Sequence, residues 1–430
     1  MRDNVPPGRS DREYAAMPPG RKILGLDIAR TVAITLAMLN HSFIATNVWE
    51  DFFEQKPHFA FVVRLATPMF IILFGALLEV VYRNRADRDG IQSVTARLFE
   101  RAFLCWLLYA LTLIPVLWMG RLSLKSAFFG ALLAGKIPLS DILRYYAILF
   151  FLAPLILVAR LRWGLAPLLI ASTAILLLHP LFVLLPAPPP NFAHYVPARL
   201  ADLLLGIGDA VAGPSVLHSL FFVAVGMLIG WLLSEDRSAD AEVRKSVTRR
   251  FLLLCGALGV GALATYFMGP EKVTAETAAG MVLRNANHPF YFFCGALGTA
   301  MIVALCRSVR QGGPGFERAT MLGRRSLFTF SAGNAFLIFV TRDYDQSIPE
   351  RLLLSGLFFV VVVGLAALYD IVMQPDALTS PNPVVRVSSR WWRAITDPVN
   401  RLLRTAALRL TSLLSWVPLF SQREVQSSQR

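Results

Sequence analysis

The sequence predicts an all-α, polytopic integral membrane protein with about ten transmembrane helices. The chain has 430 residues, of which 55% are hydrophobic, and its mean hydropathy is +0.55. Its apolar residues gather in runs near the ~20 residues that a helix needs to cross a bilayer. The polar segments between the runs are too short to form a separate soluble domain.

The apolar runs define the expected helices in chain order. Residues 119–142 include the sequence SAFFGALLAG, which could form a re-entrant or interfacial helix. We expect a disordered cytoplasmic tail over 1–23, a transmembrane domain over 24–375 and a second cytoplasmic tail over 376–430. The expected spans are 24–45, 60–82, 100–118, 143–160, 164–185, 216–234, 250–268, 289–307, 326–341 and 352–374.

Two segments outside these spans have distinctive patterns. Residues 399–417 place leucines and other apolar residues at helical spacing with arginines mostly on other faces, which predicts an amphipathic helix on the lipid of the inner leaflet. The proline-rich loop 186–215 carries Arg199 and Asp202 among other polar residues. This mixture is typical of a loop that binds a polar ligand, and equally of an ordinary solvated loop.

The basic residues predict the orientation of the chain. If the N-terminus is cytoplasmic, 30 of the 42 Lys and Arg residues fall on the inside and ten on the outside, including Arg144 at the start of the fourth span. Arg30 and Arg64 lie within spans. This asymmetry follows the positive-inside rule and places both termini in the cytoplasm, as expected for a bacterial inner membrane protein. The net charge of +14 therefore requires no nucleic-acid partner.

The first span carries ionisable residues on one face. At 100° per residue, Asp27, Arg30 and His41 share a single stripe of the helix. The rise of about 16 Å between Arg30 and His41 places the first two residues near the cytoplasmic surface and the imidazole in the outer half of the bilayer. Ionisable residues at such depths are usually functional. The structural alternatives are an ion pair that holds the bundle together and a histidine that is merely interfacial.

Neighbouring spans place polar residues at the same depths. Arg64 in the second span and Arg144 and Tyr145 in the fourth lie at the depth of His41. Glu79 lies at the depth of Asp27, so we expect an ion pair of Arg30 with Glu79 or Asp27. Two polar clusters joined by one helix face suggest a reaction path through the membrane.

The spacing of Asp27, Arg30, Ala33 and His41 resembles the first-helix signature of the acyltransferase-3 family of membrane acyltransferases. RLATPMFIILFGALL and ARLFERAFLCWLLY resemble the second helix and the basic inner loop of that family, and ILRYYAILFFLAPLIL is similar to the branch that succinylates periplasmic glucans. LGRRSLFTFSAGNAFL resembles a late family element, except that Phe330 replaces an aromatic hydroxyl and Asn334 stands where many members have histidine.

The resemblance implies transfer of an acetyl or succinyl group from cytoplasmic acyl-coenzyme A to a hydroxyl of an envelope, periplasmic or exported glycan. His41 would deprotonate the hydroxyl or carry the acyl group itself. Arg64, Tyr145 or Asn40 would orient the imidazole or stabilise an oxyanion, and Asn40 would also contact the substrate, together with Arg144 and Asn334. A second cation, Arg64 or Arg144, would suit a dicarboxylic acyl group.

The coenzyme's phosphates require cations on the cytoplasmic side. Arg30, Arg97 and Arg101 fit this role by position, with Asp27 in the same cluster. The alternative is that Arg97 and Arg101 only anchor the topology. We expect no metal, and no glycine-rich phosphate loop is present.

Two other function classes remain compatible with a polar helix stripe. A transporter or flippase for a sugar or lipid-linked substrate would also carry charges within its spans, although it commonly has paired broken helices. A sensor or scaffold would tolerate substitution of His41.

Overall fold

The all-α prediction is confirmed by a computed structural model. It describes residues 24–53, 55–133, 139–186, 195–208, 213–236, 240–268, 272–274, 281–309 and 314–414, and this part of the chain contains helices and no strand. The expected tail over 1–23 and residues 415–430 lie outside the described residues.

Among the described residues, eight helical stretches are long and apolar enough to cross a membrane. Two shorter apolar helices, α10 (Leu165–Leu177) and α20 (Ser326–Val340), lie where the fifth and ninth spans were expected. The long stretches are α2 (Leu24–Ala45), α3 to α5 (Pro57–Asp89), α6 with α7 (Ile91–Trp118), α9 (Asp141–Trp163), α13 (Val216–Glu235), α14 (Ala241–Thr265), α17 (Pro289–Cys306) and α21 (Ile348–Val372).

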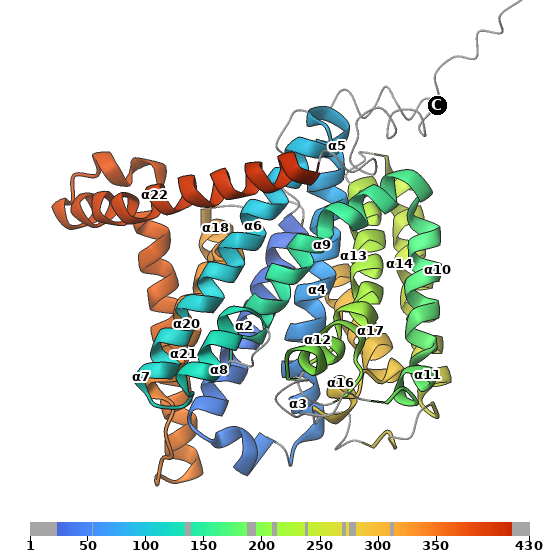
Figure 1. Cartoon of the computed structure of the whole chain (residues 1–430), viewed down its shortest axis with the longest axis horizontal. Helices are drawn as coiled ribbons and strands as arrows, with labels where there is room; N and C mark the ends of the chain where they lie inside the picture. Colours follow the sequence, from blue (N-terminus) through green and yellow to red (C-terminus); the bar gives the residue numbers. More distant parts are fainter. Residues whose placement is uncertain are drawn as a thin grey trace, which may run out of the picture.

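The connecting elements separate into two ends of the bundle (Figure 1). One end, which we term the α22 end, carries α5 (Asn84–Asp89) and α22 (Pro383–Leu414). The opposite end, termed the α16 end, carries α3 (Pro57–Arg64), α7 (Leu113–Trp118), α11 (His179–Val183) and α16 (Val282–Asn285).

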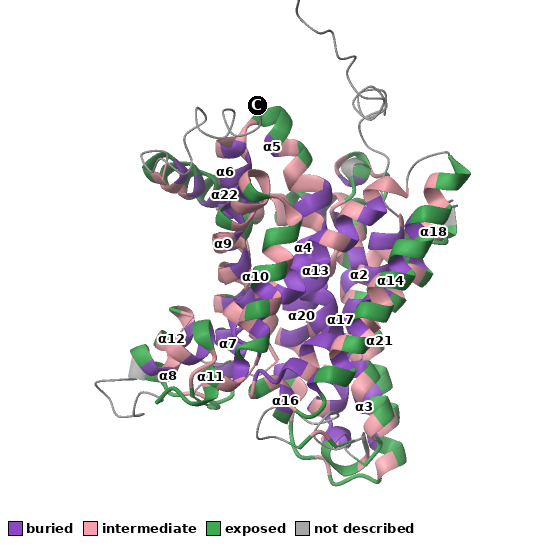
Figure 2. Cartoon of the chain, turned by 90° about the vertical axis from the view of Figure 1, so that its right-hand side faces the viewer, coloured by how far each residue is buried: buried purple, intermediate pink, exposed green. Residues whose placement is uncertain are grey.

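The core of the bundle is the crossing of α4 (Ala66–Leu77) and α13. Gly75 on α4 and Gly226 on α13 allow this approach, because a Cβ atom at either glycine would collide with backbone of the opposite helix. Figure 2 shows these two helices as the most continuously buried part of the molecule, whereas α14 presents exposed residues. Helices that pack against α4 and α13 are therefore held in fixed positions relative to one another.

The second span is less regular than predicted. Its helix is divided by a turn at Leu65 into α3 and α4, and a π-helical stretch, η2 (Leu78–Arg83), follows α4. Pro68 lies in the first turn of α4, where a missing backbone N–H removes no intrahelical hydrogen bond. The turn at Leu65 places residues from both sides of the break at the α16 end of the bundle.

The two helices expected outside the spans are present, with different bounds. The amphipathic helix was predicted to begin at 399, but α22 begins at Pro383 and continues through Pro398. It lies across its end of the bundle (Figure 1) and exposes apolar side chains such as Trp391 and Leu402. The SAFFGALLAG region forms a short helix, α8 (Leu124–Ala131), whose Leu124 and Phe128 are exposed.

Candidate functional site

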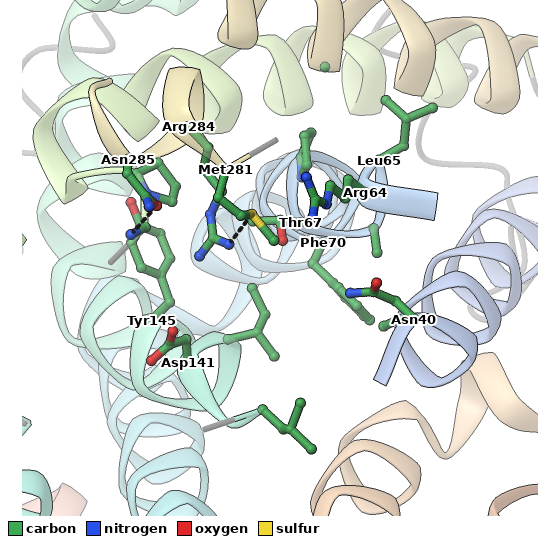
Figure 3. A pocket seen from close by; sticks show the side chains of 18 of the residues that line it. Asn40, Arg64, Leu65, Thr67, Phe70, Asp141, Tyr145, Met281, Arg284 and Asn285 are labelled. Atoms are coloured by element: carbon green, nitrogen blue, oxygen red, sulfur yellow. Dashed lines mark hydrogen bonds between the residues drawn. The ribbon is translucent and has the colours of Figure 1, made fainter. Parts of the chain in front are cut away.

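A cavity of about 430 Å³ opens near the α16 end of the bundle. Figure 3 shows side chains from several elements reaching toward this space. Its walls come from α2, from both sides of the Leu65 turn, from α9, from Phe330 on α20, and from residues of α12 (Tyr195–Leu205) and α16. The polar residues of the lining are Asn40, His41, Arg64, Thr67, Asp141, Arg144, Tyr145, Asp202, Arg284, Asn285 and Tyr291.

His41 is held in one orientation by the side chain of Asn334. The imidazole Nδ1 lies 2.7 Å from Asn334 Oδ1, and Asn334 Nδ2 donates to the Leu139 carbonyl at 2.6 Å. Because a carbonyl oxygen can only accept, the amide nitrogen must face Leu139 and the amide oxygen must face the imidazole. The proton of neutral His41 therefore lies on Nδ1, and Nε2 is the nitrogen that can accept a proton.

Helix α20 supplies this partner because its register matches that of α2. Ser326, Phe330 and Asn334 recur every four residues and share one face of α20. Along that face, Ser326 accepts from Arg30 at 3.1 Å, the ring of Phe330 lies edge-on to His41 at 5.5 Å, and Asn334 contacts Nδ1. The predicted stripe of α2 therefore packs against a complementary stripe of α20.

Arg64 and Arg144 both line the cavity, as their depth predicted. The Arg64 guanidinium lies 4.4 Å from the ring centroid of Trp49 in η1 (Trp49–Phe53), a cation–π contact. Arg144 is only 1% exposed and pairs with Asp141 at 3.3 Å. Both cations are fixed by the protein beside the space that contains His41.

Tyr145 and Asn40 line the same cavity with different bonding. The buried Tyr145 hydroxyl donates to the Ser215 carbonyl at 2.8 Å, so its proton is already engaged by the protein. Asn40 is 9% exposed, and its Oδ1 is buried without a hydrogen-bond partner among the described residues. The side chain that contacts the imidazole is thus that of Asn334, which was expected to contact the substrate, rather than that of Arg64, Tyr145 or Asn40.

Arg284 is a cavity residue that the sequence reasoning did not select. It lies on α16, a single turn between two spans, and its guanidinium contacts the sulfur of Met281 at 3.1 Å. The neighbouring Asn285 fixes this turn by accepting from the Gly213 backbone at 3.0 Å. The sequence signal is weak, because a single arginine in a loop between spans indicates only the side of the membrane on which the loop lies.

The opposite half of the bundle contains a separate ionic cluster, which we term the Glu79 cluster. Glu79 Oε1 accepts from Arg83 and Arg160, both at 2.7 Å, and Glu79 Oε2 accepts from Arg160 at 3.0 Å. The expected Arg30–Glu79 pair is therefore wrong, because arginines on η2 and α9 occupy the carboxylate. Arg30 instead donates to Ser326.

The other residues expected to bind the coenzyme also lie in this half and are absent from the cavity lining. The Asp27 carbonyl accepts from the Thr31 hydroxyl within α2. Arg97 is exposed on α6 and lies 3.8 Å from Asp89, and Arg101 is exposed one turn further along the same helix. Loop residues Arg199 and Asp202 both fall on α12, and Asp202 reaches the cavity.

The site can be compared with possible metal centres and with known families. Within the described ranges, no group of three or more His, Cys, Asp or Glu side chains is placed to hold a metal ion. No curated protein sequence matches the chain. A family model described as an acyltransferase domain, of the acyltransferase-3 type, matches residues 23–370, which include the cavity and exclude α22. The chain therefore belongs to the acyltransferase-3 family and is an integral membrane enzyme that transfers acyl groups.

Proposed function

We propose that this enzyme moves an acetyl or succinyl group from acyl-coenzyme A, bound on the cytoplasmic side, to a hydroxyl group of an envelope, periplasmic or exported glycan. The observation that carries the proposal is the chain of hydrogen bonds from the Leu139 carbonyl through Asn334 to Nδ1 of His41. It leaves one basic nitrogen on an imidazole that lines a polar cavity.

The orientation of the site follows from the charge distribution. The segments expected in the cytoplasm hold 30 of the 42 Lys and Arg residues, and they include α5 and α22. The α22 end is then cytoplasmic, and the cavity opens toward the outside of the membrane. We assign the chain to a bacterial inner membrane, where an acceptor glycan would approach from the periplasm.

The chemistry balances with the groups of the cavity. His41 Nε2 accepts the proton of the acceptor hydroxyl as its oxygen attacks the thioester carbonyl. The C–S bond breaks, the ester forms, and the imidazolium returns the proton to the coenzyme thiolate. Arg64 lies in the same lining and can stabilise the negative charge that develops on the carbonyl oxygen.

A second route uses the same atoms in two steps. Nε2 attacks the thioester first, the coenzyme leaves as a thiol, and the acyl-imidazole then transfers its acyl group to the hydroxyl. The two routes differ kinetically, because a covalent intermediate gives ping-pong kinetics and releases coenzyme before the acceptor binds.

Arg30 and Arg101 support a donor site on the α22 side. Within the described residues neither forms an ion pair, whereas the neighbouring Arg325 is bound to Asp370 at 2.7 Å. A guanidinium group without a carboxylate partner is suited to bind phosphate. Arg97 contributes less, since Asp89 lies beside it and both side chains are substantially exposed.

Asn40 supports the placement of the acceptor in the cavity. Its Oδ1 is buried without a donor among the described residues, so a ligand that supplies an O–H group would satisfy it. A sugar presents several such groups. We therefore assign Asn40 to the acceptor and regard Arg144, which is paired with Asp141, as part of the cavity wall.

The test is acyl transfer by protein purified in detergent, where no membrane separates two compartments. Labelled acyl-coenzyme A and candidate glycans are supplied to the wild-type enzyme and to His41→Gln. We expect the substitution to lower the rate about a thousandfold, because it removes the general base while keeping a polar side chain of similar size.

The matched control is His179→Gln, since His179 is a histidine of the same bundle that is buried outside the cavity lining. It should retain transfer within about twofold of wild type. Transfer by His41→Gln at the wild-type rate would refute the catalytic assignment. A transporter without chemistry would transfer no label in detergent.

A further inference from the structure

Among the cavity residues that form no ion pair or cation–π contact, three have a polar group that is buried without a hydrogen-bond partner among the described residues. They are the Arg284 Nε–H, the Tyr291 hydroxyl and Asn40 Oδ1. Each leaves a hydrogen bond unmade, which destabilises the empty cavity. All three residues line the cavity that contains His41, so the protein leaves the hydrogen bonding of this lining incomplete.

Two of the three groups, those of Arg284 and Tyr291, are hydrogen-bond donors and would bind an acceptor. The Arg284 guanidinium can only donate, and among the described residues its one hydrogen-bond partner is the weak acceptor sulfur of Met281 at 3.1 Å. The Tyr291 hydroxyl, at the start of α17, is a donor when it faces an anion. Arg284 and Tyr291 line the same cavity as His41.

The charge of the lining agrees with this requirement. It holds three guanidinium groups, Arg64, Arg144 and Arg284, and two carboxylates, Asp141 and Asp202. Arg144 and Asp141 pair with each other, and Arg64 lies over Trp49. Within the described part of the chain, Arg284 is the lining cation with neither an ion pair nor an aromatic partner, and the lining has an excess of positive charge.

The local backbone keeps Arg284 in place and leaves room for it. Gly213 has φ +125°, and a Cβ atom there would lie 3.0 Å from Arg284 Nη2. Asn285 accepts from the Gly213 backbone, and Asn287 accepts from the Ser215 backbone at 2.6 Å. Figure 3 shows Arg284 directed into the space bounded by Tyr145, Asp141 and the α4 residues.

We propose that Arg284 and Tyr291 form a subsite for an anionic oxygen group, a carboxylate or a phosphate, carried by one of the two substrates. This inference rests on the proposed function and specifies its substrate class. The group is either the free carboxylate of a dicarboxylic acyl chain or an acidic substituent of the glycan acceptor. Asn40, on the opposite wall, accepts the hydroxyl to be acylated.

Binding is tested first, without acyl transfer. Purified protein in detergent is melted in the presence of succinate, inorganic phosphate or uncharged succinamide at constant ionic strength. We expect the two anions to raise the melting temperature of the wild type and succinamide to have no effect. Arg284→Gln and the milder Tyr291→Phe should weaken the anion effect, Arg284→Gln by about tenfold in apparent affinity.

The matched control is Arg342→Gln, because Arg342 is exposed near the α16 end and lies over Tyr344 outside the cavity. It should respond to the anions as wild type does. No stabilisation of the wild type by either anion, or equal stabilisation of Arg284→Gln, Tyr291→Phe and wild type, would overturn the subsite.

Transfer assays then identify which substrate carries the charge. If the acyl group carries it, Arg284→Gln lowers kcat/KM for succinyl-coenzyme A about tenfold and leaves acetyl-coenzyme A within about twofold. If the acceptor carries it, the loss appears with phosphate-bearing glycans and both donors, and is absent with neutral glycans. An equal loss for every combination rejects the subsite. A wild type that transfers nothing while its anion binding depends on Arg284 rejects the proposed function alone.

Discussion

The Glu79 cluster and the His41 cavity both gather arginines within a helical bundle that spans the membrane, and they differ in how those charges are satisfied. Both Glu79 oxygens accept from guanidinium groups at 2.7–3.0 Å, and the carboxylate side chain is 2% exposed. In the cavity, Arg284 Nε, the Tyr291 hydroxyl and Asn40 Oδ1 have no partner in the described part of the protein.

This difference separates structural charge from functional charge. An ion cluster whose hydrogen bonds are complete joins helices η2 and α9 and needs nothing from outside the protein. A cavity whose donors and acceptors are incomplete is stabilised by its ligand. An ionisable residue therefore indicates function most strongly when it lines a cavity and the protein also leaves one of its polar atoms without a partner.

The largest loss of activity among the predictions that follow is expected for Asn334→Leu. Leucine has nearly the same shape as asparagine, but it neither accepts from Nδ1 of His41 nor donates to Leu139. The imidazole then loses its fixed tautomer, and we expect kcat to fall on the order of 100-fold with little change in acceptor KM. Steady-state kinetics of the detergent-purified variant measure this split.

The matched control is Asn84→Leu at the α22 end, where the Asn84 side chain donates, within the described part of the chain, to the Val80 carbonyl alone. Its kcat should remain within about twofold of wild type. A kcat for Asn334→Leu equal to that of wild type would mean that Asn334 does not set the orientation of His41.

The sequence was sufficient for features that depend on periodicity. Eight of the expected spans correspond to long apolar helices, and the stripe containing Arg30 and His41 faces α20 as helical geometry requires. Spacing within one helix is fixed by 3.6 residues per turn, so such a face can be read directly from residue numbers.

Partners from distant segments could not be predicted in this way. Glu79 pairs with Arg160 on α9, and His41 contacts Asn334, which lies 293 positions further along the chain. The depth of a residue in the bilayer limits which residues can be its partners. It does not give the rotation of each helix about its own axis, which decides which of these residues meet. Arg284 could not be predicted as a cavity residue, because it lies on a four-residue helix between spans. In so short a helix, no hydrophobic periodicity indicates where the side chain points.

A smaller effect is expected at Arg30, which tests whether the α22 half contains functional charge beside its structural charge. Arg30→Gln keeps a donor for Ser326 but removes the cation. We expect the KM for acyl-coenzyme A to rise about tenfold, because a charge-assisted hydrogen bond to phosphate is lost, while the KM for the acceptor is unchanged.

The control for Arg30 is Arg83→Gln, since Arg83 lies in the same half of the bundle but is bound to Glu79. It should leave the donor KM unchanged. If the KM for acyl-coenzyme A were identical for Arg30→Gln and wild type, Arg30 would not bind the coenzyme's phosphates. Its role would then be structural only.

The smallest effect on catalysis is expected at Glu79, although the effect on stability is large. Glu79→Gln leaves Arg160, which is 12% exposed, without its carboxylate, and loss of one partner of a buried ion pair costs about 3 kcal/mol. The melting temperature in detergent should fall, and kcat per folded molecule should stay within about twofold of wild type. The double substitution Glu79→Met, Arg160→Met removes the carboxylate and the buried guanidinium, and the remaining Arg83 is 35% exposed, so most of the lost stability should be recovered because no buried charge remains uncompensated. If Glu79→Gln instead lowered kcat as strongly as Asn334→Leu at an unchanged melting temperature, completeness of hydrogen bonding would not distinguish the two regions.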